Sequence, residues 1–490
     1  MAILIVVNDP GQWPFHIPGV EVIDARSYLT RPDYSMMRRA KVFNLCRSYR
    51  YQTAGYYVSL LAEARGHKPL PSVTAIQDLK SQAIVRMVSA ELDDVIQKSL
   101  SPIQSKRFAL SIYFGRNLAK RYRQLALNLF NQFPAPLLRA QFVHEKRWQL
   151  RSLAAIPASE VPESHRDFVV RTATEYFAGR GGRVRRRTRA RYDLAILCRS
   201  GDQQPPSDEK ALSRFVKAAE SVGLAAQCIT RDDYARLAEF DALFIRETTA
   251  VNHFTYRFSR RASTEGLVVV DDPESIVKCA NKVYLAELLT RHGIPTPRTL
   301  VVHRENIDAV AGEIGFPCVL KEPDSAFSRG VTKADTAEEL DDQLQRLLAR
   351  SDLVVAQVFL PTTFDWRIGI LDGRPLFACK YFMARSHWQI INHGANGNRR
   401  YGSWETLPVE LAPRRAVRVA LKAANLIGSG FYGVDVKQSG DRFYVVEIND
   451  NPNVDTGVED AVLKEELYRR VMSFFLQRIE RRKAWSSGND

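Results

Sequence analysis

The sequence has no run of about 18 uncharged apolar residues, the length that a membrane-spanning helix needs, so we expect no such helix in its 490 residues. No basic segment precedes its first apolar run, so residues 3–7 are expected to form a β-strand and not part of a signal peptide. None of its six cysteines forms a CxxC pair. Dispersed cysteines among apolar neighbours favour reduced core thiols in a cytoplasmic protein over a disulfide framework or a zinc site.

Two motif classes are also missing. The phosphate-binding motif GxxxxGK[ST] does not occur, which excludes a P-loop nucleotide site. No Ser-His-Asp set is evident, so a covalent serine mechanism is not expected. We find no internal repeat, and the only low-complexity tract is rich in arginine. The chemistry is therefore expected to rest on isolated charged residues placed by strands.

Basic residues outnumber acidic ones, giving a formal net charge of +15. This balance fits an anionic partner such as a nucleotide, an acidic peptide or nucleic acid, although a solvated basic surface is the simpler alternative. The densest run has seven arginines between positions 180 and 191. It lies between two organised regions, which favours a linker, and it has no interleaved aromatic platform for stacking RNA bases.

Periodicity divides the chain into α/β and α+β regions. We expect an N-terminal α/β domain at 1–180, an arginine-rich linker at 181–191, a small parallel α/β domain at 192–280 and a strand-dominated domain at 281–480. In the third of these, apolar strands alternate with a helical segment in the β-α-β order of a parallel sheet. In the last, the strand spacing is that of antiparallel hairpins and meanders.

The most informative segment is a predicted β-hairpin at residues 433–453, with a turn signal at 439–441 (SGD). Glu447 and Asn449 are two residues apart, so both point to one face of their strand. An odd-numbered loop centred on the last turn residue places Asp435 directly opposite Glu447, whereas a two-residue loop places it on the other face. In the first case two carboxylates and an amide oxygen converge, which suits Mg²⁺. The alternative is a solvent-facing hairpin edge.

Basic residues mark a candidate phosphate site. Lys321 lies within an apolar strand, where an ammonium is unusual unless it meets an anion. The small residues that follow, including Ser328 and Gly330, offer backbone N–H groups to phosphates. Lys282 begins a predicted helix, where a cation opposes the helix dipole and a bound anion would offset that cost. A structural loop and an exposed lysine are the respective alternatives.

The run 354–371 carries further candidates. A buried strand is expected to end at Gln357, Val358, Phe359 and Leu360, whose main chain would form an edge for a nucleotide base. Asp365 is a candidate acceptor for ribose hydroxyls. Arg367 shares its face and is placed to reach an anion. A purely structural Asp365–Arg367 pair is the alternative.

In this order, these residues are similar to the ATP-grasp pattern, and residues 192–480 resemble the RimK-type glutamate ligases. The stretch NLCRSYRYQTAGYYVSLLAEARGHKPLP resembles the extra domain found before the ATP-grasp unit in a RimK-like subgroup. The resemblance implies an ATP-grasp fold preceded by a pre-ATP-grasp domain and an additional N-terminal α/β domain. It implies that the divalent ion, Mg²⁺ or Mn²⁺, is held by Asp435, Glu447 and Asn449. It also places Lys321 and Lys282 on the phosphates of ATP.

The chain departs from this family pattern at two places. Arg329 stands in the phosphate loop where many relatives have glycine. The acceptor segment begins at Lys380, and Lys380-Tyr381 replaces an arginine pair that the family would have there. Lys380 and Asn392 in this segment join Arg367 as candidate catalytic residues.

The expected reaction is ATP-dependent joining of a carboxylate to an amine through an acyl phosphate, adding glutamate or a similar amino acid to a peptide, protein or small acidic acceptor. A dipeptide- or glutathione-type synthetase, or a nucleotide-binding regulator without turnover, are the alternatives. Contact with RNA or a ribosomal protein through the basic surface and assembly into a homo-oligomer are further hypotheses. No membrane partner is expected.

Overall fold

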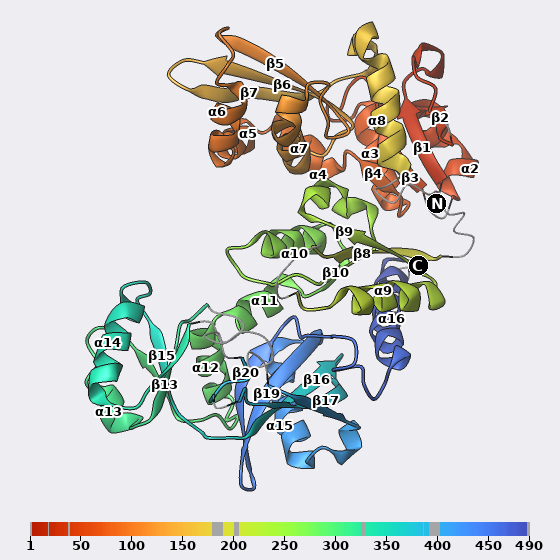
Figure 1. Ribbon diagram of the computed structural model, residues 1–490. Coiled ribbons are helices and arrows are strands. Elements are labelled where there is room, and N and C mark those ends of the chain that lie inside the picture. Colours follow the sequence, from red (N-terminus) through yellow and green to blue (C-terminus); the bar gives the residue numbers. More distant parts are fainter. Residues whose placement is uncertain are drawn as a thin grey trace. The chain divides into compact units, whose positions relative to one another are not determined.

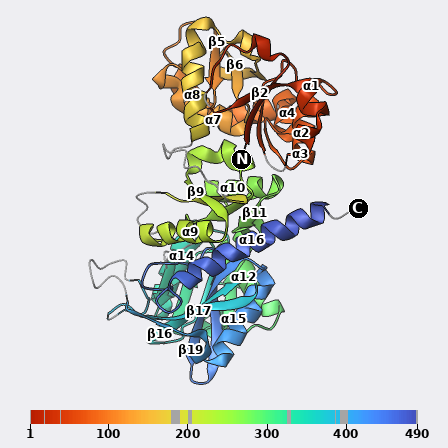
Figure 2. The same ribbon diagram turned by 90° about the vertical axis from the view of Figure 1, so that its right-hand side faces the viewer.

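The protein, described by a computed structural model, forms two compact units (Figures 1 and 2). Unit 1 comprises Met1–Thr188 and Asp232–Glu239, and unit 2 comprises Arg189–Arg231 and Phe240–Asp490. Each unit has its own sheets and its own apolar core. The structure describes residues 2–17, 19–37, 40–178, 190–199, 205–324, 330–385, 387–391 and 402–487.

Unit 1 opens with a parallel sheet of order β2-β1-β3-β4. The sequence of β1 is an unbroken apolar run whose last four residues are buried, as is typical of a parallel strand covered on both faces. The strands are β1 (Ala2–Val7), β2 (Glu21–Asp24), β3 (Ala40–Asn44) and β4 (Lys68–Leu70), and the helices are α1 (Ala25–Thr30), α2 (Pro32–Ser35), α3 (Ala54–Ala64) and α4 (Val73–Lys80).

An antiparallel sheet of order β5-β6-β7 completes unit 1. Its second and third strands pair as an antiparallel hairpin. One core cluster joins both sheets, and Ala235 of the later segment Asp232–Glu239 belongs to it. The elements are α5 (Gln82–Glu91), α6 (Asp93–Leu100), β5 (Arg107–Tyr113), α7 (Arg123–Gln132), β6 (Leu137–His144), β7 (Trp148–Ala155) and α8 (Arg166–Ala178).

Unit 2 begins with a second parallel sheet, of order β11-β10-β8-β9. The C-terminal helix α16 (Glu465–Ser487) packs against α9 on this sheet (Figure 2). Phe244 stands between the two helices, with ring centroids 5.2 Å from Phe215 and 5.3 Å from Phe475. The elements are β8 (Tyr192–Leu197), α9 (Glu209–Ser221), β9 (Leu224–Ile229), β10 (Ala242–Ile245), α10 (Phe254–Thr264), β11 (Val268–Val270) and α11 (Pro273–Ala280).

The two parallel sheets belong to a repeated module, so the expectation of no internal repeat is wrong. Helix α3, strand β4 and helix α4 are followed 200 positions later by α10, β11 and α11, with starts at 54 and 254, 68 and 268, and 73 and 273. The two sheets also share one strand order once β1, β3 and β4 are matched to β8, β10 and β11. The repeat escapes a reading of the sequence because it preserves burial and hydrogen bonding more than residue identity.

Two antiparallel sheets follow in unit 2, of orders β12-β15-β13-β14 and β18-β17-β16-β19-β20. Each encloses a core of its own with the helices that flank it. The first has β12 (Thr299–Val302), β13 (Cys318–Lys321), β14 (Val331–Ala334) and β15 (Val354–Val358), with α13 (Ala309–Glu313) and α14 (Ala337–Leu348). Helix α12 (Lys282–Arg291) precedes β12 and contributes Leu285 and Leu289 to the core of the second sheet. The second has β16 (Phe364–Leu371), β17 (Arg374–Phe382), β18 (Trp404–Leu407), β19 (Phe431–Ser439) and β20 (Arg442–Asn449), with α15 (Arg414–Ile427).

Within the described part of the chain, none of the helices has both the length and the hydrophobicity that crossing a lipid bilayer requires. Four of the six cysteines are buried, Cys198 is half-buried and Cys228 is exposed, and all six are free thiols.

Candidate functional site

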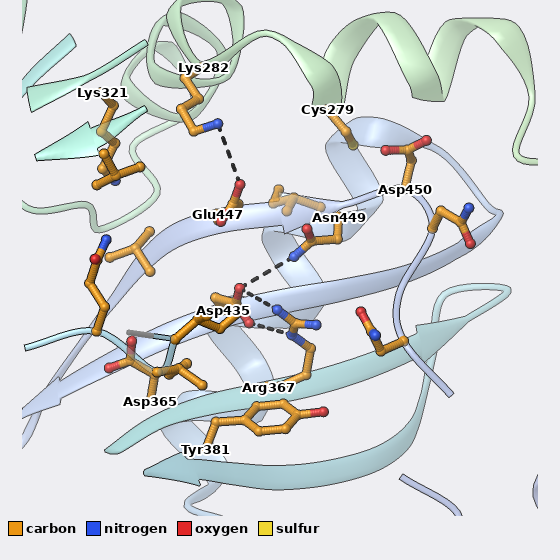
Figure 3. A pocket seen from close by; sticks show the side chains of 18 of the residues that line it. Cys279, Lys282, Lys321, Asp365, Arg367, Tyr381, Asp435, Glu447, Asn449 and Asp450 are labelled. Carbon is orange, nitrogen blue, oxygen red and sulfur yellow. Dashed lines mark hydrogen bonds and ion pairs between the residues drawn. The ribbon is translucent and has the colours of Figure 1, made fainter. Parts of the chain in front are cut away.

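A cavity of about 750 Å³ lies within unit 2, between the two antiparallel sheets and the loops of the parallel sheet. Residues from β13 and β15 line one part, and residues from β16, β19 and β20 line another (Figure 3). Two segments of the parallel module, 205–208 and 248–252, contribute as well. The cavity gathers most of the sequence-predicted site residues in one place.

The β19–β20 ribbon carries the predicted metal ligands, and its register depends on both its loop and a β-bulge. Ser439 pairs with Arg442, so the loop has two residues and not an odd number. A β-bulge then shifts the register by one residue: Val436 pairs with Val445, whereas Asp435 pairs with Glu447. Of the two loop lengths considered, the two-residue loop is present, and the bulge restores the convergence expected for an odd loop, because one extra residue reverses the face.

Asp435 also holds a buried ion pair with Arg367 of the neighbouring strand β16. Nε of Arg367 donates to Oδ1 at 2.5 Å and Nη2 donates to Oδ2 at 2.7 Å, a bidentate contact (Figure 3). Burial disfavours the charged guanidinium, but the adjacent carboxylate prevails and raises the pKa of Arg367 above its ordinary value. Arg367 is therefore a permanent cation in the cavity wall.

The three predicted ligands fit a hard divalent cation. Nδ2 of Asn449 donates to Oδ2 of Asp435 at 3.3 Å, and Nζ of Lys282 lies 3.7 Å from Oε1 of Glu447. Arg367 takes one acceptor position on each Asp435 oxygen and Asn449 takes the second on Oδ2, so Oδ1 keeps a position for an ion, because a carboxylate has about four such positions. Among the described residues no three His, Cys, Asp or Glu side chains form a metal-binding group. Two carboxylates and an amide oxygen suit an ion that completes its ligands with phosphate oxygens.

Lys321 lies at the end of β13 and points toward the same cavity (Figure 3). Its Nζ donates to Oε1 of Gln357 on β15 at 2.8 Å, and Nε2 of Gln357 donates to Thr299 at 2.8 Å. Burial lowers the pKa of Lys321 to about 8. A buried ammonium with one neutral acceptor is prepared to receive an anion, whose charge would raise that pKa again.

The predicted base-binding edge and its acidic neighbour also line the cavity. Val358, Phe359 and Leu360 follow Gln357 on the wall. Oδ1 of Asp365 accepts from Lys437 at 2.7 Å and from Thr362 at 2.8 Å. Asp365 is therefore paired with Lys437, a cation that the sequence analysis did not single out. Lys437 lies two positions after Asp435 on the same strand.

Four predicted residues are not part of this group. Lys380 does not line the cavity: its Nζ donates to Glu405 at 2.8 Å, because neighbours on β17 point to opposite faces and Tyr381 takes the cavity side. Gly330 does not line it either, although Val331 does. Ser328 and Asn392 lie outside the described residues, as do Arg329 and most of residues 181–191.

Tyr381 belongs to a buried acidic network that the sequence did not reveal. Its hydroxyl donates to Glu459, and Oε2 of Glu459 accepts from the backbone N–H of Asp455 at 2.8 Å. Burial raises the pKa of Glu459 to about 7 and that of Asp450 to about 7. The only sequence signal is the run of polar residues just after Asn449.

Gly433 of β19 makes room for Arg367. A Cβ at this position would lie 3.0 Å from Cδ of Arg367 and 2.8 Å from Cβ of Pro452. We expect Gly433→Ala to lower the free energy of unfolding by about 1–3 kcal/mol and to reduce turnover, since Arg367 must move. Gly312→Ala, in open space on α13, is the control: it should leave turnover unchanged and should not lower stability, because alanine is favoured over glycine within a helix. Denaturant titration checks this; equal stability of the two variants would contradict it.

Comparisons with known proteins agree with this geometry. Residues 25–172 match the RimK-like ATP-grasp N-terminal domain and residues 279–464 match the RimK-like ATP-grasp domain. An α-aminoadipate–LysW ligase, LysX, of Saccharolobus solfataricus is 28% identical over 195 residues, which are 38% of this chain and 67% of that protein. A probable α-L-glutamate ligase of Thioalkalivibrio sulfidiphilus is 26% identical over 245 residues, 49% of this chain and 78% of that protein.

Among solved structures, a RimK domain ATP-grasp protein of Sphaerobacter thermophilus aligns with a TM-score of 0.44 and 18% identity, covering 58% of this chain and 98% of that one. The family models, together with the paired antiparallel sheets around one cavity, confirm the expected fold class and the expected ligase activity. The chain belongs to the RimK-like ATP-grasp ligases and carries, ahead of the catalytic unit, the RimK-like ATP-grasp N-terminal domain.

Proposed function

We propose that this ATP-dependent carboxylate–amine ligase adds glutamate or a similar amino acid to the carboxylate of a peptide, protein or small acidic acceptor. The observation that carries the proposal is the pairing of Asp435 with Glu447 across the bulged ribbon, beside Asn449 and in the same cavity as Lys321. Relatives named as glutamate and α-aminoadipate ligases support an amino acid with a second carboxylate as one substrate.

The two ends of the cavity are expected to bind different parts of the substrates. Lys321 and Lys282 would bind the phosphates of ATP, and Gln357 to Leu360 would hold the base against the end of β15. Asp435, Glu447 and Asn449 would hold Mg²⁺ or Mn²⁺, which supplies Lewis-acid charge to phosphate oxygens when bound.

The reaction then has two steps. The acceptor carboxylate attacks the γ-phosphorus, and an acyl phosphate and ADP form. The amine attacks the acyl carbon, and phosphate leaves with the bonding electron pair while the amine loses a proton. Arg367 stabilises the tetrahedral oxyanion of the second step, since its charge is permanent. The cavity walls must exclude water, which would hydrolyse the acyl phosphate.

The test is ADP release by the full chain over a panel of amino acids and acidic peptides, with mass analysis of each acceptor. Glutamate-dependent ADP release with a matching mass increase on a peptide supports the proposal. Dependence on a single free amino acid, with dipeptide formation, would instead show a dipeptide synthetase. Nucleotide binding without any turnover would overturn the proposal in favour of a regulator.

Lys321→Ala is expected to weaken ATP binding by about 10- to 100-fold, because a hydrogen bond to a charged group contributes about 1.5–3 kcal/mol. The ATP affinity of the wild type should fall as the pH rises through about 8, because the ammonium of Lys321 in the nucleotide-free protein loses its proton there. The variant should lack this dependence. Lys380→Ala, on the outer face of β17, is the matched control. Calorimetry measures both, and an unchanged affinity in Lys321→Ala would remove this residue from the nucleotide site.

A further inference from the structure

The N-terminal module of unit 1 repeats the module whose loop lines the catalytic cavity. Ser59 on α3 donates to the carbonyl of Pro71 at 2.7 Å, and Ser259 on α10 donates to the carbonyl of Asp271 at 2.6 Å. Gly66 and Gly266 end the two helices with φ of 68° and 77°. These matches place residues 46–53 of the first module where 246–253 lie in the second.

The strand order singles out the same loop. From β1 the chain moves to β2 on one side and then to β3 on the other, so the order reverses between β1 and β3. In open parallel sheets, ligands bind at the carboxyl ends of the strands at such a reversal. The segments there are 8–12, after β1, and 45–53, after β3. The backbone N–H of Arg47 donates to Oδ1 of Asn8 at 2.7 Å and ties them together.

The side chains at this edge are basic and aromatic. Arg47, Arg50 and Lys80 are exposed, and Nζ of Lys80 donates to the carbonyl of Tyr49 at 2.7 Å, which holds this cation beside the loop. In segments 8–12 and 45–53 the one carboxylate is Asp9, which accepts from the backbone N–H of Gly11. The edge therefore presents a positive surface.

Tyrosines extend this surface. Tyr51 is 67% exposed, and the centroid of its ring lies 5.1 Å from that of Tyr56, which in turn lies 5.8 Å from that of Tyr57. Exposed rings beside arginines provide contact area at a low cost in side-chain entropy, a feature of surfaces that bind other molecules.

We propose that this edge of unit 1, formed by Arg47, Arg50, Lys80 and Tyr51, binds an acidic segment of the polypeptide acceptor. The proposal rests on the proposed function in taking that acceptor to be a polypeptide. Arginines bind carboxylates in bidentate fashion, and three cations at one edge match a short acidic segment. Proteins that bind a single nucleic-acid strand usually have a basic groove that runs along its backbone over several nucleotides. Three cations at one edge make a shorter site, which favours the peptide over RNA.

The test measures binding of a fluorescein-labelled hexaglutamate peptide to the full chain by anisotropy, without ATP. A neutral peptide of the same length and a single-stranded RNA oligomer are the comparison probes. Arg47→Glu/Arg50→Glu should bind the acidic peptide at least about tenfold more weakly than the wild type, since two charge-assisted contacts become repulsive. The control Arg86→Glu/Lys98→Glu makes the same change of net charge at exposed positions on α5 and α6 and should retain binding.

Equal loss in both double variants, no loss in the first, or preference for RNA over the acidic peptide would each overturn the proposal. ADP release with a free amino acid acceptor should be the same in Arg47→Glu/Arg50→Glu as in the wild type. Because binding is measured without nucleotide, failure of ligation leaves this result standing, and failure of peptide binding leaves the ligase site of unit 2 untouched.

Discussion

Glu447→Gln is expected to lower ATP-dependent ADP release by about 100-fold or more, the scale on which removal of one preorganised electrostatic group acts. The change keeps the shape of the side chain and removes its charge. Glu447 lies opposite Asp435 and 3.7 Å from the ammonium of Lys282, so the substitution removes both a predicted metal ligand and a phosphate-site neighbour. Coupled ADP detection at saturating ATP measures the effect.

The control for this variant is Glu410→Gln, the same chemical change at an exposed position outside the cavity. It should leave turnover unchanged. Raising the Mg²⁺ or Mn²⁺ concentration should restore part of the activity of Glu447→Gln, because this variant loses affinity for the ion. The control should keep full activity at the original concentration of the ion. Unchanged ADP release in Glu447→Gln would remove this residue from the metal site.

Arg367→Met is expected to lower the free energy of unfolding by about 3–5 kcal/mol, the cost of leaving one partner of a buried ion pair alone. Asp435 would then be a buried carboxylate without its bidentate cation. The double variant Arg367→Met/Asp435→Leu should recover much of this stability while remaining inactive, since two apolar groups need no partners. Thermal and denaturant unfolding of the single and double variants measure the coupling.

The pH dependence of Arg367→Met gives a second check with a defined sign. Burial already raises the pKa of Asp435 above its ordinary value although Arg367 opposes this, so removal of the guanidinium should raise it further. The unfolded state then binds fewer protons, so the variant loses stability as the pH rises through that raised pKa and regains it in acid. Arg346→Met, which breaks an exposed pair with Asp342 on α14, should cost at most about 1 kcal/mol. An equal loss in both would contradict the account.

Much of the catalytic unit could be predicted because strands impose a period of two on polar residues. That period places Glu447 with Asn449 on one face. The order of charged residues along the chain then matches the ATP-grasp pattern. The prediction that Lys380 lies in the site could not be made reliably from its position in a strand, because the sequence does not say which of two neighbouring residues faces the cavity. In the structure, Tyr381 faces the cavity and Lys380 does not.

Two features depend on tertiary structure and escape sequence reasoning. The bulge at Val446 restores the pairing of Asp435 with Glu447 after a two-residue turn, and no glycine or proline within β20 marks it in the sequence. The repeated module likewise shares hydrogen bonds, such as those of Ser59 and Ser259, more than it shares residues. Arg47 and Arg50 lie at the edge where a parallel sheet binds ligands because of the strand order, which the sequence does not reveal.

The most direct measurement of carboxylate activation uses an acidic peptide acceptor whose carboxylate oxygens are ¹⁸O, incubated with the protein, ATP, Mg²⁺ and glutamate. Attack of that carboxylate on the γ-phosphorus should carry one ¹⁸O atom into the released inorganic phosphate as the amide forms. Phosphate free of label, or label found in AMP, would contradict the acyl-phosphate mechanism.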